Sequence, residues 1–507
     1  MYPIVGLLVL LSACMSETAA VSVICIIPSA ICSLWITWHL TSKEDGNAPV
    51  TLPECPLTTV LPFFYKRFDF IRRGLELTGQ SVYTFKLIST SVVVVSGAAA
   101  RHDFFLSREL DLHSGFKILS GAIPLLPGVT VDLASRRISL IYKRLAMAQN
   151  SDRLERLIPT ILQDLQHNIK LWGHSGILSP FDLIPQLTFH ANVRSLASAE
   201  MADDPDLVVR LKSLYDTLDA AMTPAAVMFP WFPSPSAIRR IIATKKIYSI
   251  ICAAIDARRD GKTTRDDTLQ LLLDNGDDKL VIVGFIMGLL VAGARSTGTT
   301  ASWLMTFLSG HPHWKERATA ELRQLISDHA HICAPSPDVD ALDELSASLS
   351  TVPLDAWESE TPVLDALIRE TLRLAQPHTA MRMNTGPEIY LAGKTVPPGT
   401  FVVYPFSDAH LSPELYPDPW KFDPARPESK MPFSYVGWGA GKTVCLGQRL
   451  AKLQLKLVIA VLTLGFDLTA VDSTGHQLSS LPRPDWNDSL HCKPTGTLCY
   501  IRYKLAC

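Results

Sequence analysis

The sequence has neither closely spaced cysteines nor an excess of charge. Its ten cysteines are scattered, and no Cys-x-x-Cys or other zinc-ligand spacing occurs among them. This scatter argues against a zinc domain and a disulfide scaffold, and it favours a reducing compartment for the folded part. A formal net charge of −2 over 507 residues argues against the basic face that nucleic acid requires, so no nucleic-acid partner is expected.

The sequence also has no internal repeat, and no low-complexity linker divides it after residue 60. A chain of this length ordinarily forms two or three domains. With 47% hydrophobic residues it can bury a large core, and the missing linker favours one large domain over residues 46–507.

An uncharged apolar segment, Ala19–Leu40, precedes that domain. As a helix it is long enough to cross the ~30 Å hydrocarbon core of a bilayer, and Trp35 and Trp38 near its end suit the membrane interface. No Lys or Arg precedes the segment, whereas basic residues follow it, so the positive-inside rule places the body of the protein in the cytosol. We therefore expect residues 1–45 to be a single-pass anchor; cleavage of Ile4–Cys14 as a signal sequence is the alternative.

Hydrophobic periodicity predicts a mainly helical fold with a small β portion. The longest helix candidate, Lys279–Gly310, is apolar almost all round, so it should be central and buried. The β-branched run Phe85–Ser96 predicts strands, and Leu391–Tyr404 predicts a hairpin. Further helices are expected over residues 132–149, 153–172, 207–221, 238–258, 314–329 and 363–374.

The most informative segment surrounds Cys445, in the string Trp438-Gly-Ala-Gly-Lys-Thr-Val-Cys-Leu-Gly447. Glycines let the backbone turn tightly and approach a flat ligand, and amides freed by such a turn can donate to the sulfur. The start of the amphipathic segment Gln448–Leu462 favours negative charge beside it. A thiolate that holds a haem iron needs this environment. The alternative is a glycine-rich loop with an incidental buried cysteine.

Two further segments precede the cysteine loop in an informative order. Glu370 and Arg373 lie three residues apart in a run with helical spacing, where they can pair. The proline-stiffened stretch Tyr416–Pro427, which contains Arg426, follows. In this order the three segments resemble the cytochrome P450 family, the haem-thiolate monooxygenases. The resemblance extends from about Pro53 to the C-terminus, and over residues 75–280 it is one of general layout only.

The resemblance implies the P450 fold and haem b held through Cys445. It also implies that Glu370, Arg373 and Arg426 form a buried structural triad that braces the cysteine loop. Around the cysteine, the loop residues expected to contact the cofactor are Trp438, Gly439, Lys442 and Gly447.

The loop departs from the family pattern at two positions. Trp438 replaces the common Phe but keeps an aromatic ring against the sulfur. Thr443 stands where the family has Arg or His on a haem propionate, so Lys442 is expected to take part of that role. Arg382 matches the family's other propionate-binding arginine. Arg137 is the candidate for the arginine of the Trp-x-x-x-Arg helix, in competition with Arg136, Lys143 and Arg144.

The long central helix departs as well. In the family it carries Ala/Gly-Gly-x-acid-Thr, whose acid and hydroxyl relay protons. Counted back from Pro312, Arg295 takes the acid position and Ser296 the alcohol position, with Thr297 beside it. We expect Ser296 and Thr297 to form the relay. An unpaired buried charge is costly, so Arg295 should meet a substrate carboxylate, a protein carboxylate or solvent; a slipped register that exposes Arg295 is the alternative.

The expected function is that of a microsomal monooxygenase that inserts one oxygen atom from O2 into an apolar small molecule. The chain has no Gly-x-Gly-x-x-Gly motif and no flavin segment, so electrons should come from NADPH-cytochrome P450 reductase. The expected location is the endoplasmic reticulum membrane, in contact with lipid, with the catalytic domain in the cytosol. The segments Phe63–Phe70 and Trp438–Lys442 are most similar to fungal members that act in secondary metabolism, which suggests a terpenoid substrate.

Two alternatives stay open. The first is a peroxide isomerase or dehydratase of the same fold, motivated by the loss of the acid at Arg295. The second is a haem- or lipid-binding membrane protein without turnover.

Overall fold

A computed structural model describes residues 46–115, 135–229, 232–261, 264–330 and 340–506, with the side chains of 135–138 left out. Two compact units can be distinguished. One comprises residues 1–48 and 393–395 and lies almost wholly outside the described residues, as does the expected anchor over 1–45. The other comprises residues 49–392 and 396–507, and the fold below is that of this unit.

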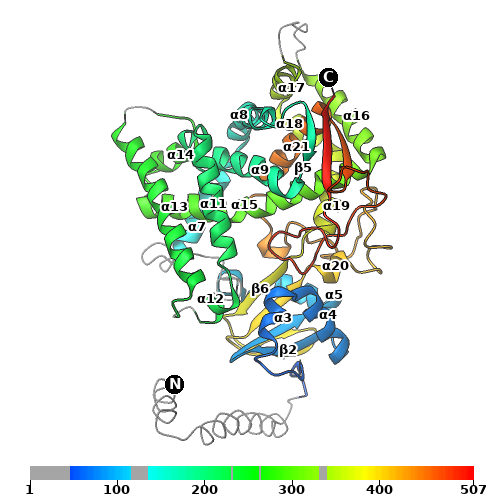
Figure 1. Ribbon diagram of the computed structural model, residues 1–507. Helices are drawn as coiled ribbons and strands as arrows, with labels where there is room; N and C mark the ends of the chain where they lie inside the picture. The colour runs from blue at the N-terminus through cyan, green and yellow to red at the C-terminus, as the bar shows by residue number, and fades with distance from the viewer. Residues whose placement is uncertain (1–45, 116–134, 230–231, 262–263, 331–339, 507) are drawn as a thin grey trace, which may run out of the picture. The chain divides into compact units, whose positions relative to one another are not determined.

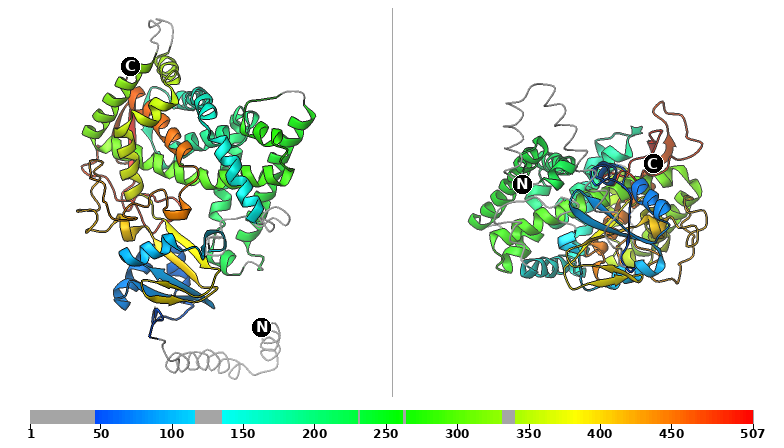
Figure 2. Two further views of the ribbon diagram at one scale, coloured as in Figure 1. Left: turned by 180° about the vertical axis from the view of Figure 1, so that it is seen from behind. Right: turned by 90° about the horizontal axis from the view of Figure 1, so that it is seen from below.

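The helical part is built around α15 (Lys279–Gly310), whose bounds agree with the sequence prediction. The side chain of Asp278 caps its first turn by accepting the Val281 amide at 2.8 Å. Of the described helices, α15 alone is long and apolar enough to cross a membrane, but half of its apolar stretch is buried inside the protein, as expected of a core helix. Figure 1 shows α15 crossing the middle of this unit, and the view from behind in Figure 2 agrees.

Four helices make the most extensive contacts with α15. They are α9 (Pro180–Leu196), α13 (Pro235–Asp260), α19 (Pro362–Leu374) and α21 (Gln448–Gly465). Periodicity located α13, α19 and α21 to within a few residues. It did not identify α9, because that helix is buried on most sides and has no clear polar face. The other helices are α3 (Val60–Tyr65), α4 (Arg67–Thr78), α5 (Gly97–Leu106), α7 (Ser135–Ala148), α8 (Ser151–Lys170), α10 (Ala199–Ala202), α11 (Pro205–Ala220), α12 (Pro224–Met228), α14 (Thr268–Asp274), α16 (Pro312–His329), α17 (Ala341–Ser350), α18 (Leu354–Ser359) and α20 (Ser407–His410).

The β portion consists mainly of two sheets. The larger has the order β1-β2-β3-β9-β6-β4, and the smaller has the order β10-β11-β5. In Figure 1 the larger sheet lies beside α3, α4 and α5. The strands are β1 (Val50–Thr51), β2 (Val82–Leu87), β3 (Thr90–Val95), β4 (Leu110–Asp111), β5 (Ser175–Leu178), β6 (Thr379–Asn384), β7 (Ile389–Leu391), β8 (Lys394–Val396), β9 (Phe401–Pro405), β10 (Phe466–Val471) and β11 (Tyr500–Leu505).

The prediction of a hairpin over Leu391–Tyr404 was wrong for its second strand, β9, which does not pair with β8. β9 lies between β3, to which it is parallel, and β6, to which it is antiparallel. All five residues of β9 are buried, and a strand covered on both faces is an uninterrupted apolar run without alternation. Such a run predicts a central strand but does not identify its neighbours.

Candidate active site

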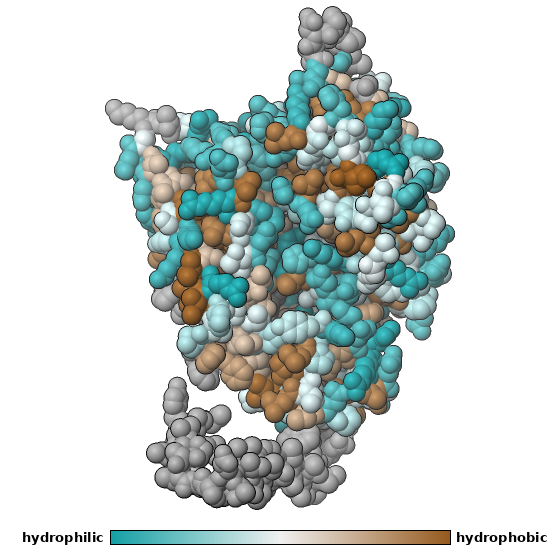
Figure 3. Space-filling view, viewed as in Figure 1, coloured by the Kyte–Doolittle hydropathy of each residue, from teal (hydrophilic) through white to brown (hydrophobic). Residues whose placement is uncertain are grey.

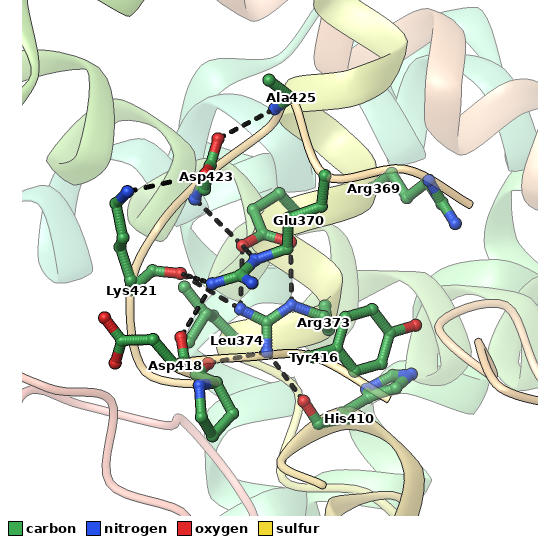
Figure 4. Close-up of polar contacts among 12 residues, drawn as sticks. Arg369, Glu370, Arg373, Leu374, His410, Tyr416, Asp418, Lys421, Asp423 and Ala425 are labelled. Atoms are coloured by element: carbon green, nitrogen blue, oxygen red, sulfur yellow. Dashed lines mark hydrogen bonds and ion pairs between the residues drawn. The ribbon is translucent and has the colours of Figure 1, made fainter. Parts of the chain in front are cut away.

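Glu370 is the centre of a buried ionic cluster. Arg373 donates two hydrogen bonds of 2.8 Å, from Nε to Oε2 and from Nη2 to Oε1 of Glu370. Arg426 donates from Nε to Oε1 at 3.1 Å. Arg373 is 1% exposed and Glu370 5%. Figure 4 shows the Arg373 guanidinium lying against the Glu370 carboxylate. The structure therefore brings the three residues of the expected triad together.

The two arginines also fasten the loop that follows α20. Arg373 Nη1 donates to the carbonyl oxygens of His410 and Pro419, each at 2.7 Å. Arg426 donates to the carbonyls of Pro417, Asp418 and Lys421. Backbone carbonyls are thereby satisfied in a segment that its prolines keep out of regular structure. The cluster fixes residues 410–426 against α19.

His410 extends this connection towards the cysteine loop. It is fully buried, and its Nε2 accepts the Val436 amide at 3.0 Å. Burial and the nearby Arg373, Arg101 and Arg369 lower the pKa of His410 to about 3. The ring is therefore neutral at neutral pH, as an acceptor must be.

The depressed pKa of His410 predicts acid sensitivity. Unfolded histidine has a pKa near 6.5, so below that pH the unfolded chain binds a proton that the folded chain refuses. The stability due to neutral His410 is present above pH ~6.5 and is lost as the pH falls towards 3, at up to about 1.4 kcal/mol per pH unit. Urea titrations between pH 7 and 4.5 should show a smaller pH slope for His410→Gln than for the wild type. Equal slopes would contradict a neutral buried His410.

The cysteine loop is shaped by two glycines in the left-handed region. Gly439 has φ +76°, and a Cβ there would lie 2.4 Å from the Thr443 carbonyl oxygen. Gly441 has φ +60°, and a Cβ there would lie 2.2 Å from the Phe105 carbonyl oxygen. Neither position accepts a side chain without displacing backbone. The turn closes where the Cys445 amide donates to the Trp438 carbonyl at 2.7 Å, and Trp438 packs against the main core.

The turn leaves the Cys445 thiol exposed between two exposed apolar side chains, Val444 (45%) and Leu446 (51%). Desolvation raises the pKa of the thiol although the side chain is exposed, and the Gly447 amide counteracts this in part. Protein atoms therefore surround the thiol closely enough to desolvate it without covering its surface. At Gly447 a Cβ would meet nothing within 4 Å. The surroundings of Cys445 therefore fit a flat apolar group that would cover them, such as haem.

Arg382 on β6 supports this fit. It is buried, and its Nη2 donates to Thr443 Oγ1 at 2.6 Å, so it is tied to the cysteine loop. No carboxylate of the described residues lies within ion-pair distance of Arg382, and burial lowers its pKa to about 10. Asp111 acts on Arg382 only from beyond ion-pair distance, so the buried cation suits a carboxylate ligand such as a haem propionate. Thr443 lacks a charge, yet it positions the arginine that carries one.

The remaining cofactor candidates are distinguished by their contacts. Arg144 is not available, because Asp277 accepts from its Nε at 2.6 Å and from its Nη2 at 2.8 Å in a buried pair. Lys442 and Lys143 are exposed. Arg137 lies in α7, but its side chain and that of Arg136 are outside the described side chains. The structure therefore removes Arg144 and leaves the expectation for Arg137 untested.

The three central-helix candidates differ in their surroundings. Ser296 is exposed, and its Oγ donates to the Ala292 carbonyl at 3.0 Å. Thr297 is buried. Arg295 is partly buried, with its Nη1 3.7 Å from Asp219 Oδ1 on α11. Of the partners expected for Arg295, the structure shows a protein carboxylate.

Three residues near this site were not anticipated. His378 follows α19, Asp219 ends α11, and His491 precedes β11. The carboxylate and the two imidazoles come from segments far from α15 in the chain, and no spacing in the sequence associates them with Arg295.

Comparison with known proteins identifies the class. The family model for cytochrome P450 matches residues 177–485. Cytochrome P450 monooxygenase AacuE of Aspergillus aculeatus is 29% identical over 90% of this chain and 94% of its own length. Cytochrome P450 monooxygenase nsrP of Aspergillus novofumigatus is 30% identical over 81% of each chain. Lanosterol 14-alpha demethylase of Mus musculus is 28% identical over 77% of this chain and 76% of its own length.

A solved structure of the cyanobacterial CYP120A1 with retinoic acid bound has the same fold, with a TM-score of 0.70 over 90% of this chain and 99% of that chain, at 22% identity. Fold and site together define a haem-thiolate oxidoreductase. The chain belongs to the cytochrome P450 family, and its cofactor is a haem iron with a thiolate ligand.

Proposed function

We propose that Cys445 is the axial thiolate and that the protein inserts one oxygen atom from O2 into an apolar small molecule, a terpenoid or another secondary metabolite. The observation that carries this assignment is the Cys445 thiol, exposed in a glycine-shaped turn beside a buried Arg382 that forms no ion pair with a carboxylate of the described residues. The fungal monooxygenases among its relatives support the monooxygenase reaction.

Each candidate site residue has a distinct role in this assignment. Cys445 would hold the iron, and Arg382 would bind a propionate, with Lys442 and Arg137 as further cations. Trp438, Gly439 and Gly447 would shape the loop that receives the cofactor. When bound, the haem would supply the activation of dioxygen, from which one oxygen atom enters the product and the other leaves as water with two electrons from the reductase and two protons. Ser296 would guide the proton through its exposed hydroxyl, which can still accept a hydrogen bond while it donates to Ala292.

Electrons are proposed to come from NADPH-cytochrome P450 reductase, and the catalytic domain is proposed to face the cytosol at the endoplasmic reticulum membrane. One exposed face supports contact with lipid. On α13, Ile238, Ile241 and Ile242 are 47–48% exposed at a spacing that places them together. In Figure 3 apolar side chains gather over α13 at the left of the view. Exposed basic residues adjoin them, as in helices that lie on anionic membranes: Arg239, Lys245 and Lys246.

The direct test is to express the full chain with a reductase in a host that supplies candidate terpenes, and to profile metabolites without preselection. An oxygenated product that needs the chain, the reductase and NADPH is expected. Turnover without reductase or NADPH would favour the peroxide isomerase or dehydratase. A haem-loaded protein that consumes no dioxygen with any ligand would favour a binding protein without turnover.

The proton relay predicts uncoupling in the double variant Ser296→Ala/Thr297→Ala. Haem and substrate binding should persist, because neither hydroxyl contacts the cysteine loop. Product formed per NADPH should fall by roughly tenfold or more, since positioned proton donors contribute about 10²–10⁴-fold to rates. The missing reducing equivalents should appear as hydrogen peroxide.

Thr306→Val is the matched control, because Thr306 is a buried α15 threonine whose hydroxyl donates to the Ser302 carbonyl. Its product-to-NADPH ratio should equal that of the wild type. An unchanged ratio in the double alanine variant would remove the relay and strengthen the peroxide isomerase alternative.

A further inference from the structure

The middle of α15 presents an exposed face although most of the helix is buried. Gly288, Ala292 and Ser296 are exposed and lie on one side of the helix at successive intervals of four residues. Arg295 borders this face and is partly exposed. It has the only charged side chain between Lys279 and Lys315. Because an unpaired buried charge is costly, this partly buried guanidinium needs an anionic or polar partner.

Asp219 compensates this cation poorly. The 3.7 Å between Arg295 Nη1 and Asp219 Oδ1 is within ion-pair range but too long for a hydrogen bond. Nη1 has no hydrogen-bond partner among the described residues. Burial raises the pKa of Asp219, and the lowering by Arg295 and His491 does not fully offset it. The charged form of this carboxylate is therefore destabilised by its surroundings. The buried Nη1 of Arg295 is therefore left without an acceptor at hydrogen-bond distance among the described residues.

His378 relates Arg295 electrostatically to Arg382, which contacts the cysteine loop. Its side chain is exposed, yet desolvation lowers its pKa to about 3, with further lowering by Arg382, Arg67 and Arg295. His378 is therefore neutral at neutral pH and lies within electrostatic range of both Arg295 and Arg382. Arg382 in turn contacts Thr443 of the cysteine loop. The guanidiniums of Arg67, Arg295 and Arg382 thus make the surroundings of His378 electropositive. Of these three, only Arg382 has an expected role with the cofactor.

We propose that Arg295 is a specificity-determining residue that binds a carboxylate on the substrate, so that the substrate class is an apolar carboxylic acid. This inference rests on the proposed function and refines its substrate. A guanidinium recognises a carboxylate through two parallel N–H···O bonds, which fix orientation as well as charge. Asp219 acts as a positioning residue: its negative charge keeps Arg295 tolerable in the unliganded protein, and the substrate carboxylate supplies the better-placed acceptor.

The test uses the holoenzyme and three pairs of probes: lauric, palmitic and abietic acid, each with its methyl ester. Dissociation constants come from the shift of the haem Soret band on titration. The wild type should bind at least one acid more tightly than its ester. Arg295→Gln should weaken that acid roughly tenfold to a hundredfold, the range for loss of a charged hydrogen bond, and leave the ester unchanged. Asp219→Asn should tighten the acid roughly two- to tenfold, because the competing charge is gone.

The opposite signs separate this role from a structural one. If the ion pair only stabilised the packing of α11 on α15, both variants would shift acid and ester in the same direction. Shifts of the same direction in both variants would overturn the proposal. Equal binding of acid and ester by the wild type would overturn it as well, as would the absence of a Soret shift with every acid. The reduced carbon monoxide spectrum is recorded for every variant. A normal thiolate spectrum without acid preference defeats this inference alone, whereas loss of that spectrum from the wild type defeats the proposed function.

Discussion

Cys445→Ala should abolish the carbon monoxide spectrum that is characteristic of a haem with a thiolate ligand. The variant removes a single sulfur atom, and the turn that presents it does not depend on the side chain. The turn is held by the Cys445 amide on the Trp438 carbonyl and by the positive φ angles of Gly439 and Gly441. The variant should therefore fold and lose only the iron ligand.

Two measurements make this result specific. Far-UV circular dichroism and the urea midpoint of the cofactor-free protein should match those of the wild type, which excludes unfolding as the cause. Cys55→Ala is the control: Cys55 is a partly exposed free cysteine, and its substitution should leave the spectrum intact. A thiolate spectrum that persists in Cys445→Ala would show that another cysteine binds iron, and the assignment of the cysteine loop would be wrong.

The sequence predicted those parts of the molecule whose information is local. The bounds of α15 follow from an apolar run between the Asp278 cap and Pro312. Glu370 and Arg373 pair across one turn of α19, and their spacing together with the order of the segments that follow them predicted this contact. The turns of the cysteine loop follow from glycines, because other residues rarely adopt the required backbone angles.

The sequence could not predict features that depend on the packing of distant segments. Asp219 meets Arg295 only because α11 lies near α15, and no pattern relates the two positions. The sequence identified Arg295 as unusual but could not choose between a protein carboxylate, a substrate carboxylate and solvent. β9 illustrates the same limit, because a buried apolar run is compatible with several neighbours. A sequence shows which side chains are charged and need hydrogen-bond partners. Which group becomes the partner depends on the tertiary structure.

Arg373→Ala should yield little or no haem-loaded protein. Arg373 makes five hydrogen bonds: two to Glu370 and one each to the carbonyls of His410, Pro419 and Lys421. Its removal leaves the buried Glu370 carboxylate with Arg426 as its remaining cation. Breaking a buried ion pair on one side costs roughly 3–5 kcal/mol, because an uncompensated charge stays behind. That is a large part of the 5–15 kcal/mol by which domains are typically stable.

The loss should reach the cofactor site through His410. Without Arg373, the segment after α20 loses its attachment to α19, and His410 loses the arginine that fixes its carbonyl while its ring still accepts the Val436 amide. Val436 is two residues from Trp438, where the cysteine turn begins. We therefore expect the haem-to-protein ratio to fall further than the fraction of folded protein measured by circular dichroism.

Arg369→Ala is the matched control on the same helix. Arg369 pairs at 3.2 Å with Glu428, whose side chain is 79% exposed, and its guanidinium lies over the Tyr435 ring. An exposed ion pair contributes only about 0–1 kcal/mol and a cation–π contact about 0.5–2 kcal/mol, so both are weaker than the buried Glu370 cluster. The haem content and urea midpoint of this variant should stay close to those of the wild type. If Arg373→Ala instead behaves like Arg369→Ala, the Glu370 cluster contributes no more than a surface pair. Selective loss in Arg373→Ala means that α19 supports the cysteine loop, because the two substitutions delete the same side chain from neighbouring turns and differ only in what that side chain holds.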